Sequence, residues 1–295
     1  MLPLELSTLL HRALEARLDR LLLLTARDGW LQEIEAVHDV RVASRRLRTV
    51  LDLSDPDCYP GFRKQRKRAK ALTEALGASR ELDVHVIQLA QLGSELADPA
   101  RHAVLEHVLE VFELKRTKAR TRMVREVMRV QVSELSGLRD AVPSGTAGDL
   151  PAALRTLLEP RLRAILEDAR QRVVVEDAPA LHRLRIGVKK LRYAIEVLAE
   201  ALPPGTEKWL ARLKGFQGAL GEHHDWTTLE AELWELHAQL TDRRRPALAA
   251  GTLELLGSIV DRRRMAFEAL PTAAGSLDPV LAVEELLPVR GGSPA

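Results

Sequence analysis

The sequence predicts an all-α protein made of two pseudo-symmetric antiparallel helical bundles that arose from an internal duplication. Apolar residues recur with the 3.6-residue period of an amphipathic helix through most of the 295 residues. Strand signals are nearly absent, because the β-branched cluster at residues 173–175 is short and ends a helical pattern. A basic motif near position 38 returns near position 182. These observations predict helices packed on helices with short connections.

Glycine, proline and helix-start signals divide the chain into its expected elements. The first bundle, residues 1–135, should contain helices at about 4–27, 31–53, 60–77, 80–95 and 99–135. A linker is expected over residues 136–150, which are rich in Gly, Pro and Ser. The second bundle, residues 151–270, should contain helices at about 151–175, 179–201, 205–220, 223–241 and 246–270. Residues 271–295 are expected to form a C-terminal tail.

Two copies of one motif indicate the duplication. Residues 38–48 read HDVRVASRRLR and residues 182–192 read HRLRIGVKKLR, so both fit His-x-x-Arg-[Val/Ile]-x-x-[Lys/Arg]-[Lys/Arg]-Leu-Arg. The same offset, 144 positions, aligns further residues downstream, namely Lys64 with Lys208, Arg68 with Arg212, Lys70 with Lys214, and Leu76-Gly77 with Leu220-Gly221. Packing explains a repeated apolar face, whereas a repeated cationic face needs another reason.

Each motif copy separates into an apolar stripe and a cationic ridge when it is placed on a helix. The two ridges consist of His38, Arg41, Arg45 and Arg48 in the first copy and of His182, Arg185, Lys189 and Arg192 in the second. A solvated helix face usually mixes charge signs, but residues 182–192 contain no acid. Like charges on one ridge repel each other. A polyanion lying along the ridge would relieve that repulsion.

The repeated motif and the segments after it resemble the CHAD family, the conserved histidine α-helical domain. The resemblance covers about residues 1–270 and includes a basic helix closing in Leu-Gly, followed by Arg80-Glu81-Leu82-Asp83 or His224-Asp225-Trp226. It implies an all-helical pair of bundles whose basic faces bind inorganic polyphosphate, in association with polyphosphate granules. The chain departs from the family pattern at Glu81, where Asp is common, and at His224, which stands where the first copy has Arg80.

The candidate polyphosphate-binding residues belong to the two motifs and to the basic segments after them. Arg offers forked donors to phosphate oxygens, Lys offers a mobile charge, and His adds N–H donors. Phosphate and sulfate ions are further candidate ligands, and no cofactor is expected. The set comprises His38, Arg41, Arg45, Arg46, Arg48, Lys64, Lys67, Arg68, Arg80, His182, Arg185, Lys189, Lys190, Arg192, Tyr193, Lys208, Arg212, Lys214 and His224.

Charge is segregated along the chain, since the formal net charge is only +2 while residues 63–70 hold six cations in eight positions. The single cysteine, Cys58, excludes an intrachain disulfide and suits a reducing compartment. The sequence has no apolar span of membrane length and no pattern of a secretory leader at its first residues. We therefore expect a cytoplasmic protein at polyphosphate granules, without a membrane partner.

Metal binding and catalysis find less support in the sequence. His223 and His224 are adjacent, so on a helix they point about 100° apart, and the cations around His38 and His182 disfavour a divalent ion. No Gly-x-Ser-x-Gly elbow, Walker glycine loop or magnesium-binding carboxylate cluster is present. Acids near the basic helices are expected to orient cations or cap a helix. We expect a non-catalytic protein.

Nucleic-acid binding is the competing interpretation, because a basic helical surface attracts DNA and RNA through the same release of counterions. Aromatic residues make up only 3% of the chain, which disfavours a base-stacking platform. An accessory role or an enzymatic role in polyphosphate metabolism, with polyphosphate-metabolising enzymes as partners, is a further alternative. The sequence leaves open whether the two ridges face one shared groove or opposite surfaces.

Overall fold

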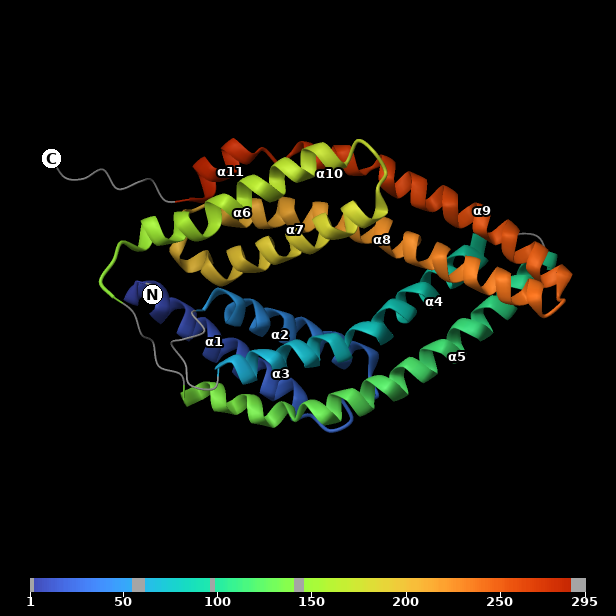
Figure 1. Cartoon of the computed structure of the whole chain (residues 1–295), viewed down its shortest axis with the longest axis horizontal. Coiled ribbons are helices and arrows are strands. Elements are labelled where there is room, and N and C mark those ends of the chain that lie inside the picture. Colours follow the sequence, from blue (N-terminus) through green and yellow to red (C-terminus); the bar gives the residue numbers. More distant parts are fainter. Residues whose placement is uncertain (1–2, 55–61, 96–98, 141–145, 288–295) are drawn as a thin grey trace.

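Helices make up nearly all of the computed structural model, which describes residues 3–54, 62–95, 99–140 and 146–287 (Figure 1). The first half contains α1 (Leu4–Thr25), α2 (Ile34–Leu53), α3 (Phe62–Ala75), α4 (Gly77–Glu95), α5 (Pro99–Val130) and the 3-10 helix η1 (Val132–Asp140). The second half contains α6 (Leu150–Arg172), α7 (Ala178–Leu198), the 3-10 turn η2 (Ala199–Ala201), α8 (Thr206–Asp242), α9 (Pro246–Glu268), α10 (Leu270–Gly275) and α11 (Pro279–Leu286). The described residues form no strand, so the all-α prediction is confirmed.

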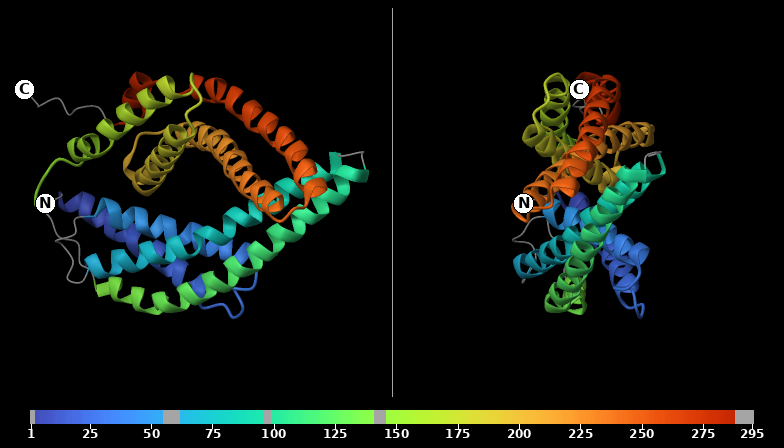
Figure 2. Two further views of the ribbon diagram at one scale, coloured as in Figure 1. Left: turned by 45° about the vertical axis from the view of Figure 1, so that its right-hand side comes forward. Right: turned by 90° about the vertical axis from the view of Figure 1, so that its right-hand side faces the viewer.

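Two apolar cores hold the helices together, and each draws on both halves of the sequence. The central core joins α1, α2, α3, the end of α5 and η1 to α6, α7, the first half of α8, α10 and α11. The distal core joins α4 and α5 to the second half of α8 and to α9. Figure 2 shows the helices of the distal core running together toward one end of the molecule. The cores therefore do not follow the expected division into bundles of residues 1–135 and 151–270.

Helix α8 differs most from expectation, because one helix of 37 residues replaces the two helices expected at 205–220 and 223–241. Gly221 lies inside α8, where a glycine costs about 1 kcal/mol relative to alanine. Burial of Leu220 and Trp226 on either side offsets that cost, since each packs into an apolar core. In the first half, the corresponding Gly77 begins a new helix, α4.

The predicted linker and tail were wrong in part, because apolar residues in both segments enter the central core. Leu138 of η1, which lies in the expected linker, is buried, and residues 141–145 of that linker lie outside the described residues. In the expected tail, Leu277 and Leu286 are buried, and Asp278 caps α11 by accepting from the backbone N–H of Val280 and Leu281. Residues 288–295, like Cys58, lie outside the described residues.

The order of helices agrees with the repeat seen in the sequence. Helices α2 and α7 begin at Ile34 and Ala178, and α3 and α8 begin at Phe62 and Thr206, which is the same offset as between the motifs. A common origin of the halves stays a prediction. No helix in the described part of the chain is long and apolar enough to cross a lipid bilayer.

Candidate functional site

Helices α2 and α7 carry the two motif copies and pack against each other. Asp177 caps α7 by accepting from the backbone N–H of Ala180 at 3.0 Å, and Pro179 lies in its first turn, where its missing N–H costs nothing. The apolar stripe of α7 is buried, including Leu184 and Val188, as is the stripe of α2. Burial of both stripes fixes the rotation of the helices and thereby the direction of their ridges.

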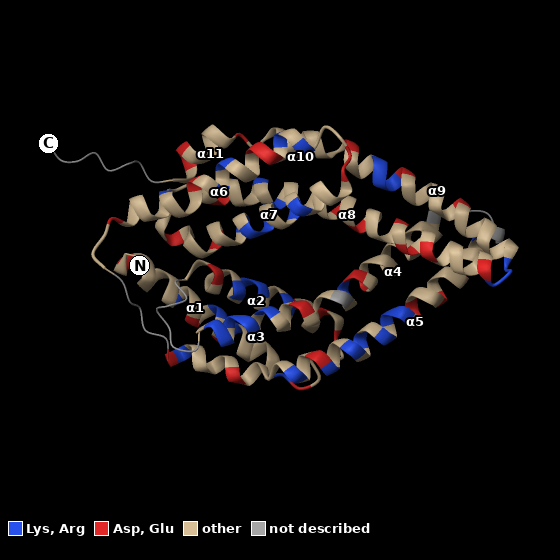
Figure 3. Ribbon diagram, viewed as in Figure 1, with Lys and Arg blue, Asp and Glu red and all other residues tan. Residues whose placement is uncertain are grey.

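The two ridges meet in what we call the central cluster, which consists of Arg41 and Arg45 on α2, Arg80 on α4, and Arg185 and Lys189 on α7. The pKa of Arg41 is lowered to about 10, by burial first and then by the charges of Arg45, Arg80 and Arg185. Cations from both halves therefore act on one another. Figure 3 shows Lys and Arg gathered on α2, α3 and α7 near the middle of the molecule. The ridges thus face each other, which the sequence had left open.

Lys189 is the cation most affected by its surroundings. Its pKa is lowered to about 7 by burial first, and then by the charges of Arg45, Arg185, Arg41 and Lys190. Near neutral pH, this amine is thus protonated in only part of the molecules. A bound anion would favour the protonated form.

The central cluster lacks the carboxylate partners that usually accompany buried cations. Among the described residues, none of its five cations forms an ion pair, and the buried Nε of Arg41 has no hydrogen-bond partner. Two acids, Glu81 and Asp225, lie within electrostatic reach without forming a salt bridge in the described part of the chain. Burial raises the pKa of Asp225, with Glu81 acting in the same direction and Arg185 opposing it. An unsatisfied buried donor costs about 1–3 kcal/mol, so an anion oxygen near Arg41 would be favourable.

Two histidines lie beside the central cluster. Nδ1 of His182 on α7 and Nδ1 of His224 on α8 are 3.3 Å apart, and the ring centroids are 4.5 Å apart. Burial lowers the pKa of His224 to about 4, with Arg185 and His182 as further causes. The pKa of His182 is lowered by burial and by Arg185 and Lys189, against the opposing charge of Glu81. Both rings are therefore neutral near pH 7, with one Nδ1 donating to the other.

Tyr193 and four of the predicted cations have partners inside the protein. Tyr193 is buried and forms a side-chain hydrogen bond with Arg45, so it helps to hold the Arg45 side chain in place. Carboxylates lie beside the four cations: Arg192 pairs with Glu196, Arg46 lies 3.7 Å from Glu196, Arg48 lies 3.8 Å from Asp52, and Arg68 pairs with Glu134. The repeated motif could not show these acids, because they lie outside it. These four cations therefore differ from the central cluster in having acidic partners, and their part in binding stays a prediction.

The remaining predicted residues lie in three other places. Lys64 and Lys67, with Arg68, line a groove between α3 and α5. Lys208, Arg212 and Lys214 are exposed on the first turns of α8, where the Arg212 guanidinium lies 4.8 Å from the centre of the Trp209 ring. His38 is half-buried on α2, and Lys190 is exposed on α7 beside a smaller pocket.

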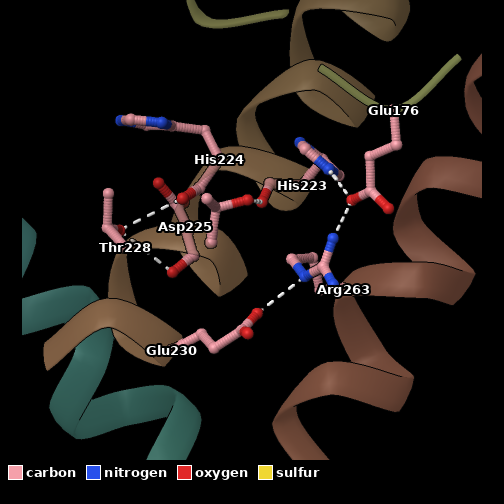
Figure 4. A network of polar contacts seen from close by, with 8 residues as sticks. Glu176, His223, His224, Asp225, Thr228, Glu230 and Arg263 are labelled. Atoms are coloured by element: carbon pink, nitrogen blue, oxygen red, sulfur yellow. Dashed lines mark hydrogen bonds and ion pairs between the residues drawn. The ribbon is translucent and has the colours of Figure 1, made fainter. Parts of the chain in front are cut away.

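A second polar group lies on the His223 side of α8 and was not found from the sequence (Figure 4). We call it the Glu176 network, and it consists of Glu176, His223, Glu230 and Arg263. Nε2 of His223 lies 2.8 Å from Oε1 of Glu176, and Arg263 donates from Nε to Glu230 at 2.7 Å and from Nη1 to Glu176. The network connects the segment before α7 to α8 and α9. His223 and His224 point apart, as adjacent helical residues must. Within the described residues, no three potential metal ligands of the His, Cys, Asp and Glu types come together.

The fold and the central cluster define a class of protein: an all-helical protein in which two similar halves bring basic helices face to face. The model of the CHAD domain family matches residues 12–234, so the chain belongs to this family. The crystal structure of the CHAD domain from the plant Ricinus communis is similar, with 22% identity, a TM-score of 0.68, and coverage of 94% of this chain and 93% of that one. PptA from Streptomyces chartreusis is similar at 18% identity, with a TM-score of 0.70 and coverage of 92% and 99%. Both likenesses concern the fold. No curated protein matches the sequence.

Proposed function

We propose that this protein binds inorganic polyphosphate through the central cluster, without converting it chemically. One observation carries the proposal: cations from both halves converge there, and no carboxylate in the described part of the chain pairs with them. Burying like charges together costs free energy that the fold must supply. A bound polyanion relieves the repulsion among these cations, so the same charges that destabilise the free protein stabilise the complex.

Polyphosphate fits this arrangement because it offers charge and little else. Each phosphate unit carries about one negative charge, and the chain is flexible, so it can follow cations on several helices. Arg41, Arg45 and Arg185 can donate in pairs to phosphate oxygens. Membership of the CHAD family supports the proposal, since the resemblance implies polyphosphate binding.

Nucleic acid is the second candidate, and the aromatic residues argue against it. Binding of single strands usually adds base stacking on exposed aromatic rings. The aromatic side chain at the central cluster, Tyr193, is buried and engaged with Arg45. We therefore expect polyphosphate to be preferred to DNA and RNA.

A competition titration tests the ligand. Long-chain polyphosphate, duplex DNA and single-stranded RNA, matched in total charge, compete for the protein at about 150 mM salt, where charges more than about 8 Å apart are largely screened. We expect polyphosphate to displace both nucleic acids, and phosphate release to stay at the level of a blank. Preference for DNA or RNA would overturn the ligand assignment, while steady phosphate release would overturn the non-catalytic part.

A matched pair of variants tests the site. Arg41→Gln, Arg45→Gln and Arg185→Gln together remove three charges from the central cluster, while Arg20→Gln, Arg183→Gln and Arg243→Gln remove three exposed charges elsewhere. We expect the first variant to lose about 100-fold or more in affinity, because charge-assisted hydrogen bonds contribute about 1.5–3 kcal/mol each. The second should lose less than about threefold, since exposed charges are screened. Equal losses in two folded variants would remove the central cluster from the site.

The same binding would recruit the protein to polyphosphate granules, where enzymes of polyphosphate metabolism are candidate partners. Purified granules, or long-chain polyphosphate precipitated with a divalent cation, can be sedimented with the protein. We expect the wild-type protein in the pellet and the triple Arg→Gln variant of the central cluster in the supernatant. Equal sedimentation of both would contradict recruitment through this site.

A further inference from the structure

A large hollow lies between α3 and α5, outside the central cluster, and we call it the basic groove. Its volume is about 920 Å³. Its walls include Lys64 and Lys67 from α3 and Lys118 and Arg122 from α5. All four side chains belong to exposed residues, and none forms an ion pair within the described residues. The groove therefore presents uncompensated positive charge on both walls.

The floor of the basic groove is apolar, which separates it from the central cluster. Ala71 and Ala75 of α3 and Ala119 and Met123 of α5 line it. Two acids, Glu74 and Glu126, also line the groove, and each pairs with a cation of its own helix, Lys70 at 3.5 Å and Arg129 at 2.7 Å. An acidic helix with a short apolar stripe fits cationic walls and an apolar floor better than an inorganic polyanion does.

A surface of that kind occurs on α5 itself, and we call it the acidic ridge. It consists of Glu106, Leu109, Glu110, Glu113, Leu114 and Thr117, which line a shallow, open stretch of surface along one side of α5, where Glu113 pairs with Arg116 at 2.8 Å. Leu114 is 63% exposed, and the Glu110 side chain is 77% exposed. The ridge thus combines negative charge with an apolar side chain that no other part of the described protein covers. Its charge and polarity complement those of the basic groove.

We propose that the acidic ridge of one copy of this chain docks in the basic groove of a second copy. The two surfaces lie on successive parts of α5 and about half a turn apart around the helix, so they cannot meet within one molecule. Because they also face different sides, the contact is heterologous: each copy keeps one free ridge or one free groove. The association is head to tail and extends with concentration.

Paired charge reversals test this contact directly. Glu106→Lys with Glu110→Lys disables the acidic ridge, and Lys118→Glu with Arg122→Glu disables the basic groove, all at exposed positions. By sedimentation velocity, wild-type protein should show a weight-average mass that rises with concentration and falls with added salt. Each variant alone should stay monomeric. An equimolar mixture should form a dimer and no larger species, because one intact ridge meets one intact groove.

A control variant and several outcomes make the proposal falsifiable. Arg20→Glu with Arg243→Glu reverses two exposed charges outside both surfaces and should associate like the wild type. Circular dichroism confirms that each variant keeps its helices. A wild-type protein that stays monomeric at every concentration overturns the proposal. So does association that survives both reversals, or a mixture that stays monomeric. If the wild type is monomeric while the groove variant loses affinity for polyphosphate, the groove belongs to polyphosphate instead.

Discussion

The central cluster and the Glu176 network are neighbouring groups of charged residues, but only the network contains acids that pair with its cations. In the Glu176 network, burial opposes ionisation, but hydrogen bonds from His223 and Arg263 outweigh it and lower the pKa of Glu176. The pKa of Arg263 is raised, because Glu176 and Glu230 outweigh the effect of burial. In the central cluster, the pKa values of Arg41, Arg45 and Lys189 are all lowered.

The direction of the pKa shift therefore separates the balanced network from the proposed binding site. The Glu176 network is balanced by its own acids, so its charged form contributes to folding. The central cluster is unbalanced, so its charges oppose folding in the free protein. This difference gives predictions on both sides, because ligand affinity and stability should respond to different residues.

The largest effect should come from raising the pH on the central cluster. Lys189 has a pKa of about 7 in the free protein, so it must take up a proton above that pH when a polyanion binds. If the polyanion restores an ordinary lysine pKa, each unit above pH 7 costs about tenfold in affinity. Titrations with polyphosphate between about pH 7 and pH 9 should therefore show a loss of roughly 100-fold.

Lys189→Arg is the control for this pH dependence, because an arginine stays charged throughout the range. The variant should bind polyphosphate with nearly the same affinity at both ends of the titration. The histidines should contribute mainly below pH 6.5, since the pKa values of His182 and His224 are lowered in the free protein. A wild-type profile that is flat above pH 7 would show that Lys189 does not contact the ligand.

A large effect on stability is expected from the Glu176 network. Arg263→Met leaves Glu176 and Glu230 without their shared cation and should lower the free energy of unfolding by about 1–3 kcal/mol. Arg264→Met, at the next position, removes an exposed arginine and should change stability by less than about 0.5 kcal/mol. Urea denaturation measures both. Polyphosphate affinity should be unchanged in both variants. A loss of affinity in Arg263→Met alone would show that the Glu176 network contributes to polyphosphate binding.

The opposite sign is expected at Lys189. Lys189→Met removes a charge that the neighbouring arginines repel, so it should raise the free energy of unfolding at neutral pH by roughly 1 kcal/mol, while it weakens polyphosphate binding. Lys190→Met, on the exposed side of α7, is the matched control and should leave stability within about 0.5 kcal/mol. A destabilised Lys189→Met would indicate that the lysine serves the fold.

The smallest effect concerns acid stability. The pKa of Glu176 is lowered from 4.5 in the folded protein, so its contribution to stability is present above pH 4.5 and is lost as the pH falls through the lower folded value. Glu176→Gln should therefore be less stable than the wild type at neutral pH, and the difference should shrink on acidification. Urea denaturation at several pH values below 5 checks this. A constant difference would assign the loss to packing alone.

Periodicity alone predicted the cationic side of α2 and α7, because burial of the apolar stripes directs Arg41, Arg45, Arg185 and Lys189 away from them. It could not predict that the ridges meet, since that depends on packing between helices 144 positions apart in the sequence. The neutralisation of Arg192 was within reach of the sequence, because Glu196 lies one helical turn away. That of Arg68 was not, because Glu134 lies 66 positions away.

The basic groove shows a further limit of the sequence. Cations are frequent in residues 115–129, so a signal was present on α5. Only the packing of α3 beside α5 shows that Lys118 and Arg122 share a wall with Lys64 and Lys67. The continuity of α8 was missed for a related reason. Gly221 is a breaker by local propensity, and the apolar contacts that keep it helical come from two separate cores.

Helix α8 also determines how this protein can be divided. At 1.5 Å per residue its 37 residues span roughly 55 Å, with one end in the central core and the other in the distal core. A cut between residues 140 and 146 would separate α4 and α5 from the second half of α8 and from α9, with which they form the distal core, and would separate α1 and α2 from α6 and α7. Neither fragment would contain a complete hydrophobic core. The two fragments should therefore recover structure only when they are mixed, which makes the chain suited to a split reporter.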